Sequence, residues 1–260
     1  MLMNLSPIRL LHHIITSLVA DPIVILNKWR GIPSYLANMR KYASLNRIPS
    51  FALSFRYLYP CLADRFQEAG TVRGQYFHQD LWAARKIFQS NPTLHYDMGS
   101  RMDGFITHLL SFRAVTVIDV RPLYSTISNL DFVQGDMTQL PYSDNSIESL
   151  SSLHVVEHVG LGRYGDQVDP RGHLQAISEL QRVSRPGGRL YFSVPIGTKE
   201  RLEFDGHRIF EVQTILKAFN QMKLISFSYI DDQGDLHECK NPSEVPDLRY
   251  GCGLFELSKN

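Results

Sequence analysis

Three short apolar runs between Thr93 and Met137, each ending in a polar residue, constrain the fold of this chain more than any other feature. The first run ends at Asp97, a turn containing Gly99 follows, and apolar residues then recur at helical spacing from Phe105 to Phe112. This pattern predicts a strand, a tight turn and a helix. Because such a turn leaves backbone N–H groups open at the start of a helix, it suits a polar ligand held close to the main chain.

The second and third runs place acidic residues where a nucleoside would meet the ends of parallel strands. Val115 to Asp119 ends in an acid about 20 residues after Asp97, a spacing at which a carboxylate can hydrogen-bond ribose hydroxyls. The third run ends at Gly135-Asp136-Met137. Three such strands describe one edge of a doubly wound sheet with a ligand crevice. On this motif alone a second interpretation stays open, in which Gly99 and Gly104 are ordinary turn glycines.

The remainder of the chain alternates predicted strands and helices. Strands are predicted at Ile147–Val156, Arg189–Pro195, Leu224–Ile230 and Gly253–Leu257, and helices at 172–184 and Val212–Phe219. Alternation at this pace favours a mostly parallel sheet with right-handed crossovers. Ligands of such sheets bind beyond the carboxyl ends of the strands, where Asp97, Asp119 and Asp136 are expected.

The length of 260 residues suits one α/β domain preceded by an extension. We expect residues 1–79 to form a basic, aromatic, helical extension, and residues 80–260 to form the α/β domain. Asp80 is expected to cap a helix that begins at Leu81, and Asn91-Pro92 is expected to end that helix.

Charge is unevenly distributed along a chain whose formal net charge is only +1. That net charge argues against nucleic-acid binding by the protein as a whole. Residues 1–60, however, contain one acid, Asp21, and seven basic residues: Arg9, Lys28, Arg30, Arg40, Lys41, Arg47 and Arg56. A segment of this composition points to a membrane surface or an acidic partner, so peripheral membrane contact through residues 1–60 is one hypothesis.

The extension contains predicted helices but no stretch that is long and apolar enough to span a membrane. Apolar residues from Ile8 to Leu18 predict a short amphipathic helix, which either lies on a membrane surface or packs on the protein itself. One or two further helices are expected from Lys28 to Leu45. The three cysteines, Cys61, Cys239 and Cys252, form no metal-binding or disulfide pattern. We therefore expect a cytoplasmic protein, with peripheral contact at the inner membrane left open.

Several of these motifs together resemble a known enzyme superfamily. They are, in order, Asp97-x-Gly99, Asp119, Gly135-Asp136-Met137-x-x-Leu140-Pro141, Glu157-His158 and Leu180-x-x-Val183-x-Arg185-Pro-Gly-Gly188. This order resembles class I S-adenosylmethionine-dependent methyltransferases over roughly residues 90–257. Asp80-Leu-Trp, Gly99-Ser-Arg and Asp119-Val-Arg-Pro122 are similar to one branch, the uncharacterised domain-of-unknown-function family 268. The implied fold is a doubly wound, mostly parallel, seven-stranded sheet with an N-terminal helical extension.

The resemblance implies S-adenosylmethionine as cofactor and assigns residues to its site. These are Asp97, Gly99, Ser100, Arg101, Asp119, Val120, Asp136, Met137 and His154. Asp97 and Gly99 would form the turn under the methionine part, Asp119 would accept from the ribose, and Asp136 with Met137 would read the adenine. His154 would flank the point of methyl transfer.

The sequence departs from the family pattern at Arg101 and Asp103, where the turn usually carries glycines. Arg101 either crowds the cofactor or grips its carboxylate in a bidentate fashion. Gly104 is a candidate for a displaced third glycine. Arg121 introduces a second cation near Asp119, which suits a phosphate-bearing ligand equally well.

His158 and Glu157 are the candidate catalytic residues because they follow the fourth predicted strand. Imidazole titrates near neutral pH, so His158 is the candidate general base for a hydroxyl acceptor. The alternatives are a histidine that caps or packs the next helix, and a Glu157 that serves as an acid at a helix N-terminus or as a hydrogen-bond partner on the cofactor side. The spacing of Asp205 and His207 relative to this pair places them on no common face, so no metal site is expected.

The sequence therefore predicts an S-adenosylmethionine-dependent methyltransferase that acts on a small molecule or a glycan. Relatives of the narrower family suggest a sugar hydroxyl in bacterial surface polysaccharide synthesis. Two alternatives remain: a binding or scaffold protein that has kept the fold without the chemistry, and an enzyme that processes nucleotide sugars. The oligomeric state is not predicted.

Overall fold

The computed structural model describes residues 22–260, which fall into two compact units that meet at Thr71 and Val72. The predicted boundary at residue 79 lies too late in the chain, because helix α3 (Gln75–Ser90) begins before it and belongs to the second unit. The same helix shows that the predicted cap at Asp80 is wrong, since this residue lies inside α3 and is buried. Asn91 ends α3 in the left-handed conformation, as predicted.

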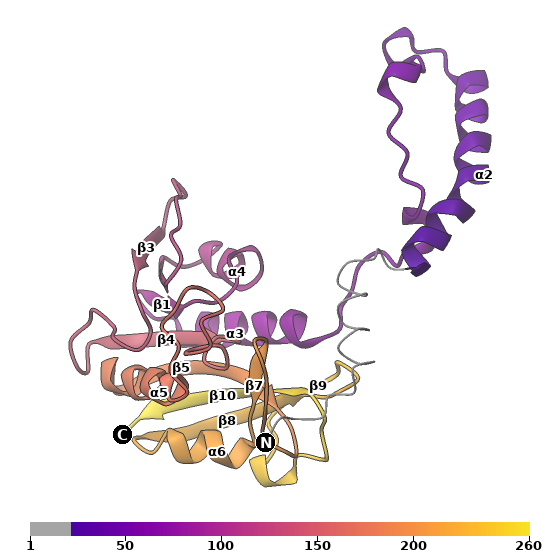
Figure 1. The fold of residues 1–260 in the computed structure, drawn as a ribbon. Helices are drawn as coiled ribbons and strands as arrows, with labels where there is room; N and C mark the ends of the chain where they lie inside the picture. The colour runs from indigo at the N-terminus through magenta and orange to yellow at the C-terminus, as the bar shows by residue number, and fades with distance from the viewer. Residues whose placement is uncertain (1–21) are drawn as a thin grey trace. The chain divides into compact units, whose positions relative to one another are not determined.

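The second unit contains the α/β fold (Figure 1). Its helices are α3, α4 (Thr107–Leu110), α5 (Gly172–Val183) and α6 (Val212–Ala218), and a π-helical turn, Met102–Ile106, precedes α4. Its first strands are β1 (His95–Met98), β2 (Val115–Asp119), β3 (Leu130–Gln134), β4 (Ile147–Leu153) and β5 (Ser184–Ile196). The later strands are β6 (Arg201–Glu203), β7 (His207–Ile209), β8 (Met222–Ile230), β9 (Leu236–His237) and β10 (Gly251–Lys259).

Eight of these strands form one sheet in the order β3-β2-β1-β4-β5-β10-β8-β9. Strands β3, β2, β1, β4 and β5 are mutually parallel, whereas β10 runs antiparallel to both β5 and β8. The doubly wound, mostly parallel sheet is thus confirmed, with the two-residue β9 added to the seven longer strands. The chain order reverses between β1 and β4, which is where ligands bind in sheets of this kind.

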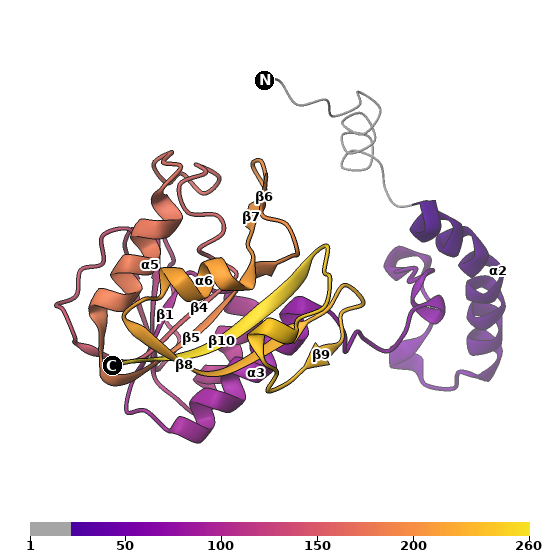
Figure 2. The same ribbon diagram turned by 90° about the horizontal axis from the view of Figure 1, so that it is seen from below.

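Helices cover both faces of the sheet, as Figure 2 shows for α5 and α6 on one side and α3 on the other. Apolar residues of α5 and α6 pack in one buried cluster, which includes Leu180 and Ile215. Those of α3 and α4 pack in a second cluster, which includes Ile87 and Leu109. Strand β2 is buried on both faces and is almost wholly apolar, Val-Thr-Val-Ile from residue 115 to 118, which is why its position could be predicted.

In the described residues, the first unit consists of helix α2 (Pro22–Leu45) and a return segment with three 3₁₀ turns, Pro49–Phe51, Phe55–Tyr57 and Asp64–Phe66. Helix α2 replaces the one or two helices expected from Lys28 to Leu45. The helix and the return segment pack closely, because a Cβ on Gly31 would overlap the Leu62 carbonyl oxygen, and the Tyr42 hydroxyl donates to the Phe51 carbonyl at 3.2 Å. The helix predicted from Ile8 to Leu18 lies outside the described residues. Within residues 22–260, no helix has the length and apolar character needed to span a bilayer.

Candidate ligand site at the strand ends

A cavity of about 520 Å³ lies at the carboxyl ends of β1, β2, β3 and β4. Eight of the nine residues predicted to bind cofactor line it: Gly99, Ser100, Arg101, Asp119, Val120, Asp136, Met137 and His154. The predicted base His158 also lines it, together with Tyr76 of α3. Its volume is that of a pocket for a small organic ligand. Residues that are far apart in the sequence therefore converge as the strand pattern predicted.

The turn after β1 brings the backbone close to the cavity. Gly99 has a φ of +71°, and a Cβ there would lie 3.0 Å from the Cγ1 atom of Val155. Glycine is required because this conformation is strained for other residues and the space for a side chain is occupied. The Gly99 amide donates to the Ile118 carbonyl at 2.8 Å, which ties the turn to β2.

Asp97 lies beneath this turn, fully buried, and does not line the cavity. Its carboxylate accepts from the Ser100 amide at 2.9 Å and from the Ser100 hydroxyl at 2.7 Å. It also accepts from Ser151 of β4, whose hydroxyl bonds to the buried His95 ring at 2.8 Å. Burial raises the pKa of Asp97 to about 6, although the serine hydrogen bonds oppose this shift. Asp97 therefore orders the turn from below and contributes no surface to the cavity.

Gly104 is not a displaced glycine of the ligand turn. A Cβ there would lie 2.4 Å from the Oδ2 atom of Asp80, so the absence of a side chain allows the π-helical turn to approach α3. Burial raises the pKa of Asp80, and Gln79 donates to its carboxylate at 3.1 Å. Gly104 and Asp80 thus form a packing contact between two elements.

Arg101 lies at the edge of the cavity and leaves its volume open. Its guanidinium lies 4.8 Å from the centre of the Tyr76 ring. It also donates to both carboxylate oxygens of Asp103, at 3.3 and 3.1 Å. The two charged residues that replace the family's glycines therefore pair with each other.

Asp119 and Asp136 face the same cavity from the ends of β2 and β3. Asp119 is already engaged, because Arg121 donates to its two oxygens at 3.0 and 2.7 Å through the side chain and at 2.8 Å through the amide. Asp136 accepts two hydrogen bonds at 2.7 Å from Thr138, both on Oδ1. Thr138 thereby fixes the Asp136 carboxylate, whereas the Asp119 carboxylate has a competing cation.

The segment after β4 carries a buried carboxylate between two imidazoles. His154 has a φ of 54°, and its Nδ1 lies 2.7 Å from Oε1 of Glu157. The same oxygen lies 3.7 Å from Nε2 of His158. Glu157 is buried, lies in a turn outside any helix and does not line the cavity. The alternative interpretation of Glu157 as an acid at a helix N-terminus is therefore wrong.

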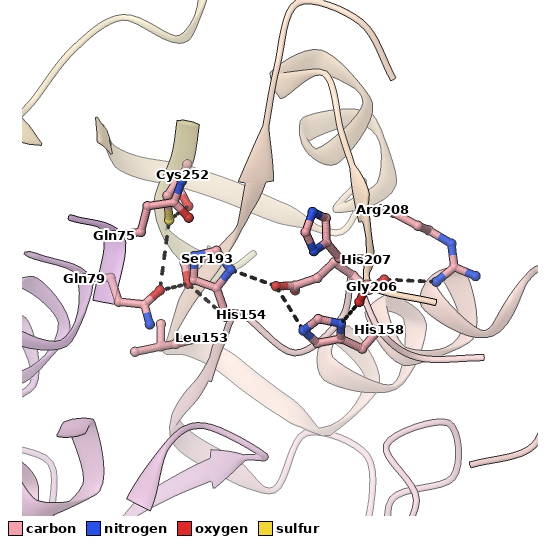
Figure 3. Close-up of polar contacts among 12 residues, drawn as sticks. Gln75, Gln79, Leu153, His154, His158, Ser193, Gly206, His207, Arg208 and Cys252 are labelled. Carbon is pink, nitrogen blue, oxygen red and sulfur yellow. Dashed lines mark hydrogen bonds and ion pairs between the residues drawn. The ribbon is translucent and has the colours of Figure 1, made fainter. Parts of the chain in front are cut away.

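The hydrogen bonds of His158 define which of its nitrogens carries the proton. Nδ1 lies 2.7 Å from the carbonyl oxygen of Gly206 (Figure 3). Because a carbonyl only accepts, Nδ1 carries the hydrogen in the neutral ring and Nε2 keeps its lone pair. Burial lowers the pKa of His158, against the opposing effect of Glu157, so the neutral ring is favoured at pH 7. His158 therefore presents the form that a general base requires.

Two buried polar atoms beside the cavity have no hydrogen-bond partner among the described residues: Nε2 of His154 and Oε2 of Glu157. Buried polar groups are normally paired, so these atoms are suited to a bound polar group or a water molecule. The main chain of His154 is fixed by the Ser193 carbonyl at 3.0 Å, and the Ser193 hydroxyl donates to Gln79 at 2.7 Å (Figure 3).

The sequence indicates a polar loop from Gly160 to Arg171 but did not assign it to the site, whereas the structure places Tyr164 and Asp166 of this loop on the cavity wall. Asp166 shapes this loop by accepting from the Gly160 amide at 2.7 Å. The Tyr164 ring lies 4.6 Å from the guanidinium carbon of Arg121 and 5.6 Å from the His158 ring. The only signal in the sequence is the group of glycines from 160 to 165, which adopt positive φ angles.

A metal site formed by Glu157, His158, Asp205 and His207 was weighed from the sequence and not expected. Within residues 22–260, no group of three or more histidine, cysteine, aspartate and glutamate side chains is arranged to hold a metal ion. His207 instead lies 3.4 Å from Glu203 and stacks near Tyr250, with 5.1 Å between ring centres.

Comparisons with known sequences identify relatives over parts of the chain. Residues 113–241 match the family model described as Caenorhabditis protein of unknown function, DUF268. A demethylmenaquinone methyltransferase of Paenarthrobacter aurescens is 37% identical over 71 residues, which cover 26% of this chain and 24% of that protein. A ubiquinone/menaquinone biosynthesis C-methyltransferase of Bdellovibrio bacteriovorus is 37% identical over 62 residues, which cover 24% and 22%. The chain thus matches less than a quarter of the length of either curated relative.

Solved structures share the fold over most of the chain. The [4+2]-cyclase SpnF has a TM-score of 0.50 at 14% identity, covering 90% of this chain and 96% of that one. The 1,6-didemethyltoxoflavin-N1-methyltransferase of Burkholderia thailandensis, solved with S-adenosylhomocysteine, has a TM-score of 0.50 at 12% identity, covering 93% and 92%. At these identities the likeness concerns the fold. The chain accordingly has the class I methyltransferase fold and is related to the DUF268 family through residues 113–241.

Proposed function

We propose that this protein is an S-adenosylmethionine-dependent methyltransferase. The observation that carries the proposal is the pair of carboxylates, Asp119 and Asp136, at adjacent strand ends in one cavity beside the glycine turn. In this proposal Asp119 accepts from the ribose hydroxyls, and Asp136 with Met137 contacts the adenine. Gly99 lets the amino-acid end approach the backbone, and Arg101 reaches its carboxylate. The cavity volume of about 520 Å³ fits such a ligand.

The cofactor supplies an activated methyl group, so the protein's task is chiefly to align the acceptor with it. Alignment of this kind contributes as much as about 7–11 kcal/mol to lowering a barrier. For a hydroxyl acceptor, His158 removes the proton through Nε2, which adds about 10²–10⁴-fold in rate. Glu157 is bonded to the His154 ring and also lies near the His158 ring. In this proposal it is therefore a positioning residue.

The proposed acceptor is a sugar hydroxyl, in the building of a bacterial surface polysaccharide in the cytoplasm. The aromatic rings of Tyr76, Tyr164 and His158 line the cavity and offer flat surfaces to the apolar face of a sugar ring. The resemblance of Gly99-Ser-Arg and Asp119-Val-Arg-Pro122 to the narrower family supports the glycan class.

Calorimetry with S-adenosylmethionine and S-adenosylhomocysteine tests the proposal. We expect both to bind, and we expect Asp119→Ala and Asp136→Ala each to weaken binding by about ten- to a hundredfold, the effect of losing a hydrogen bond to a charged group. Asp131→Ala is the matched control, since this acid of β3 is exposed and outside the cavity. Absence of heat at millimolar ligand contradicts the proposal.

The engagement of Asp119 by Arg121 favours a second candidate function. If Arg121 keeps the Asp119 carboxylate from binding ribose, the protein is a binding or scaffold protein that has kept the fold. If Arg121 instead binds a phosphate, the ligand is a nucleotide sugar. Thermal melting beside nucleotide-sugar and nicotinamide ligands separates these cases, because each ligand class raises the melting temperature only of a protein that binds it.

A further inference from the structure

The first unit has almost no core of its own. Among the side chains that the structure describes in residues 22–71, only Gly31 and Ala63 are buried. Both are small. Of the larger apolar residues, Ile32, Tyr35, Met39, Leu62 and Phe66 are half-buried, and most of the others lie at the surface. A segment of this size that buries so little apolar area gains little stability from its own packing. Its apolar surface is therefore available to a partner.

The exposed apolar residues of this unit include both aromatic and aliphatic side chains. The aromatic residues are Trp29, Tyr42, Phe51, Phe55, Tyr57 and Tyr59, and the aliphatic residues include Ile25, Leu26, Leu45, Ile48 and Leu53. These eleven exposed large apolar side chains within residues 22–60 are more than the single scattered ones expected on a soluble protein, and they point to an interaction site. Tryptophan and tyrosine in particular favour the boundary between water and lipid.

The charge of the same segment defines the partner. Residues 22–60 contain six exposed basic residues and no acid: Lys28, Arg30, Arg40, Lys41, Arg47 and Arg56. None of the six forms a salt bridge among the described residues. Like charges argue against a second copy of this surface as the partner. The aliphatic residues favour a bilayer over a nucleic acid, because a nucleic acid is held by cations and by aromatic rings that stack on bases, and gains little from exposed aliphatic side chains.

We propose that residues 22–60 form a docking surface for a bilayer that contains anionic lipids. The cations meet the headgroups, while Trp29 and its aromatic and aliphatic neighbours enter the boundary between headgroups and acyl chains. Docking of this kind needs no spanning helix. It places the second unit beside acceptors held at a membrane, and it does not depend on which reaction that unit catalyses.

Vesicle co-sedimentation of the full chain tests this surface. We expect binding to phosphatidylcholine vesicles that contain phosphatidylglycerol, and weaker binding to phosphatidylcholine alone or at high salt. Neutralising Arg40, Lys41 and Arg47 together to glutamine should lower affinity about a hundredfold, at roughly fivefold for each cation near the surface. The matched control neutralises Arg85, Lys217 and Lys223, three exposed cations of the second unit, and should leave binding unchanged.

Fluorescence reports the insertion directly, because the chain has only two tryptophans. Trp29 is 67% exposed, whereas Trp82 of α3 is 3% exposed. Anionic vesicles should shift the emission to shorter wavelength, and Trp29→Phe should abolish the shift. Equal partitioning onto neutral and anionic vesicles overturns the proposal. Protection of Trp29 from acrylamide quenching in the absence of vesicles also overturns it, because the surface would then already be covered by protein. Sedimentation velocity would show whether a second copy covers it.

Discussion

At the scale of single residues, the Asp119 carboxylate has two competing partners. Arg121 holds it with three hydrogen bonds and also lies over the Tyr164 ring. A ribose that donates to both oxygens of Asp119 must displace the Arg121 side chain at least in part, because Oδ1 already accepts two hydrogen bonds, from the amide and from Nε of Arg121. Arg121 therefore lowers the affinity for any ligand that must bind the Asp119 carboxylate.

Replacing Arg121 by glutamine should strengthen the binding of an adenosyl ligand. The bridge is partly exposed, so its removal is worth roughly threefold to tenfold in Kd. Calorimetry on Arg121→Gln measures this gain. Arg163→Gln serves as control, because Arg163 also lies over Tyr164, at 5.1 Å, but makes no contact with Asp119. Weaker binding by Arg121→Gln would mean that the guanidinium contacts the ligand itself.

Gly99 tests the geometry of the turn. Alanine there should lower the free energy of unfolding by about 1–2 kcal/mol through its left-handed backbone, with a further loss from the contact with Val155. Ligand affinity should fall as well. Gly165→Ala isolates the backbone effect, because Gly165 has a φ of +85° with no atom within 4 Å of the added Cβ. Equal urea midpoints for the two variants would show that Val155 does not restrict the turn.

Asp97 makes stability depend on pH. Its pKa of about 6 in the folded protein lies above the ordinary 3.8, so its protonated form is favoured by folding. This contribution, roughly 3 kcal/mol, is complete below about pH 4 and is lost as pH rises through 6. Asp97→Asn should therefore unfold with less dependence on pH between about 4 and 7. Identical pH profiles of unfolding for the variant and the natural protein would contradict the assignment.

At the scale of elements, the sequence was most informative where strands are buried on both faces. Strand β2 has the predicted bounds, and helix α5 ends within one residue of its predicted end. Strands β6 and β9 were not predicted, because segments of two or three residues show no periodicity. The start of α3 was missed because a buried polar residue, Asp80, looks like a cap in the sequence. In the structure Asp80 faces Gly104 of the π-helical turn and accepts a hydrogen bond from Gln79.

The candidate site was predictable in its strand-end residues and not in its contacts. Asp119 and Asp136 follow apolar runs, so their convergence follows from the topology of parallel strands. The pairing of Asp119 with Arg121 depends on side-chain conformations that no spacing encodes. Tyr164 lies in an irregular loop shaped by Asp166, so it had no pattern to mark it.

At the scale of the whole molecule, two units carry two different properties. The second unit has the class I methyltransferase fold, which SpnF, described as a cyclase, shares. Fold alone therefore does not decide the reaction, and the proposed chemistry depends on His158 and the two strand-end carboxylates. The first unit contributes a basic, aromatic surface, and the residues of that surface are separate from those that line the cavity of the second unit.

The carbonyl of Gly206 belongs to the short hairpin formed by β6 and β7, which is separate from the main sheet. It accepts from both His158 and Arg163, at 2.7 and 3.0 Å. Insertions or deletions in this hairpin can accumulate over evolution without disturbing the strands that line the cavity. The orientation of the His158 ring depends on the Gly206 carbonyl, so changes in the hairpin alone can alter it. They would thereby also alter which acceptors can reach the lone pair on Nε2 in the proposed reaction.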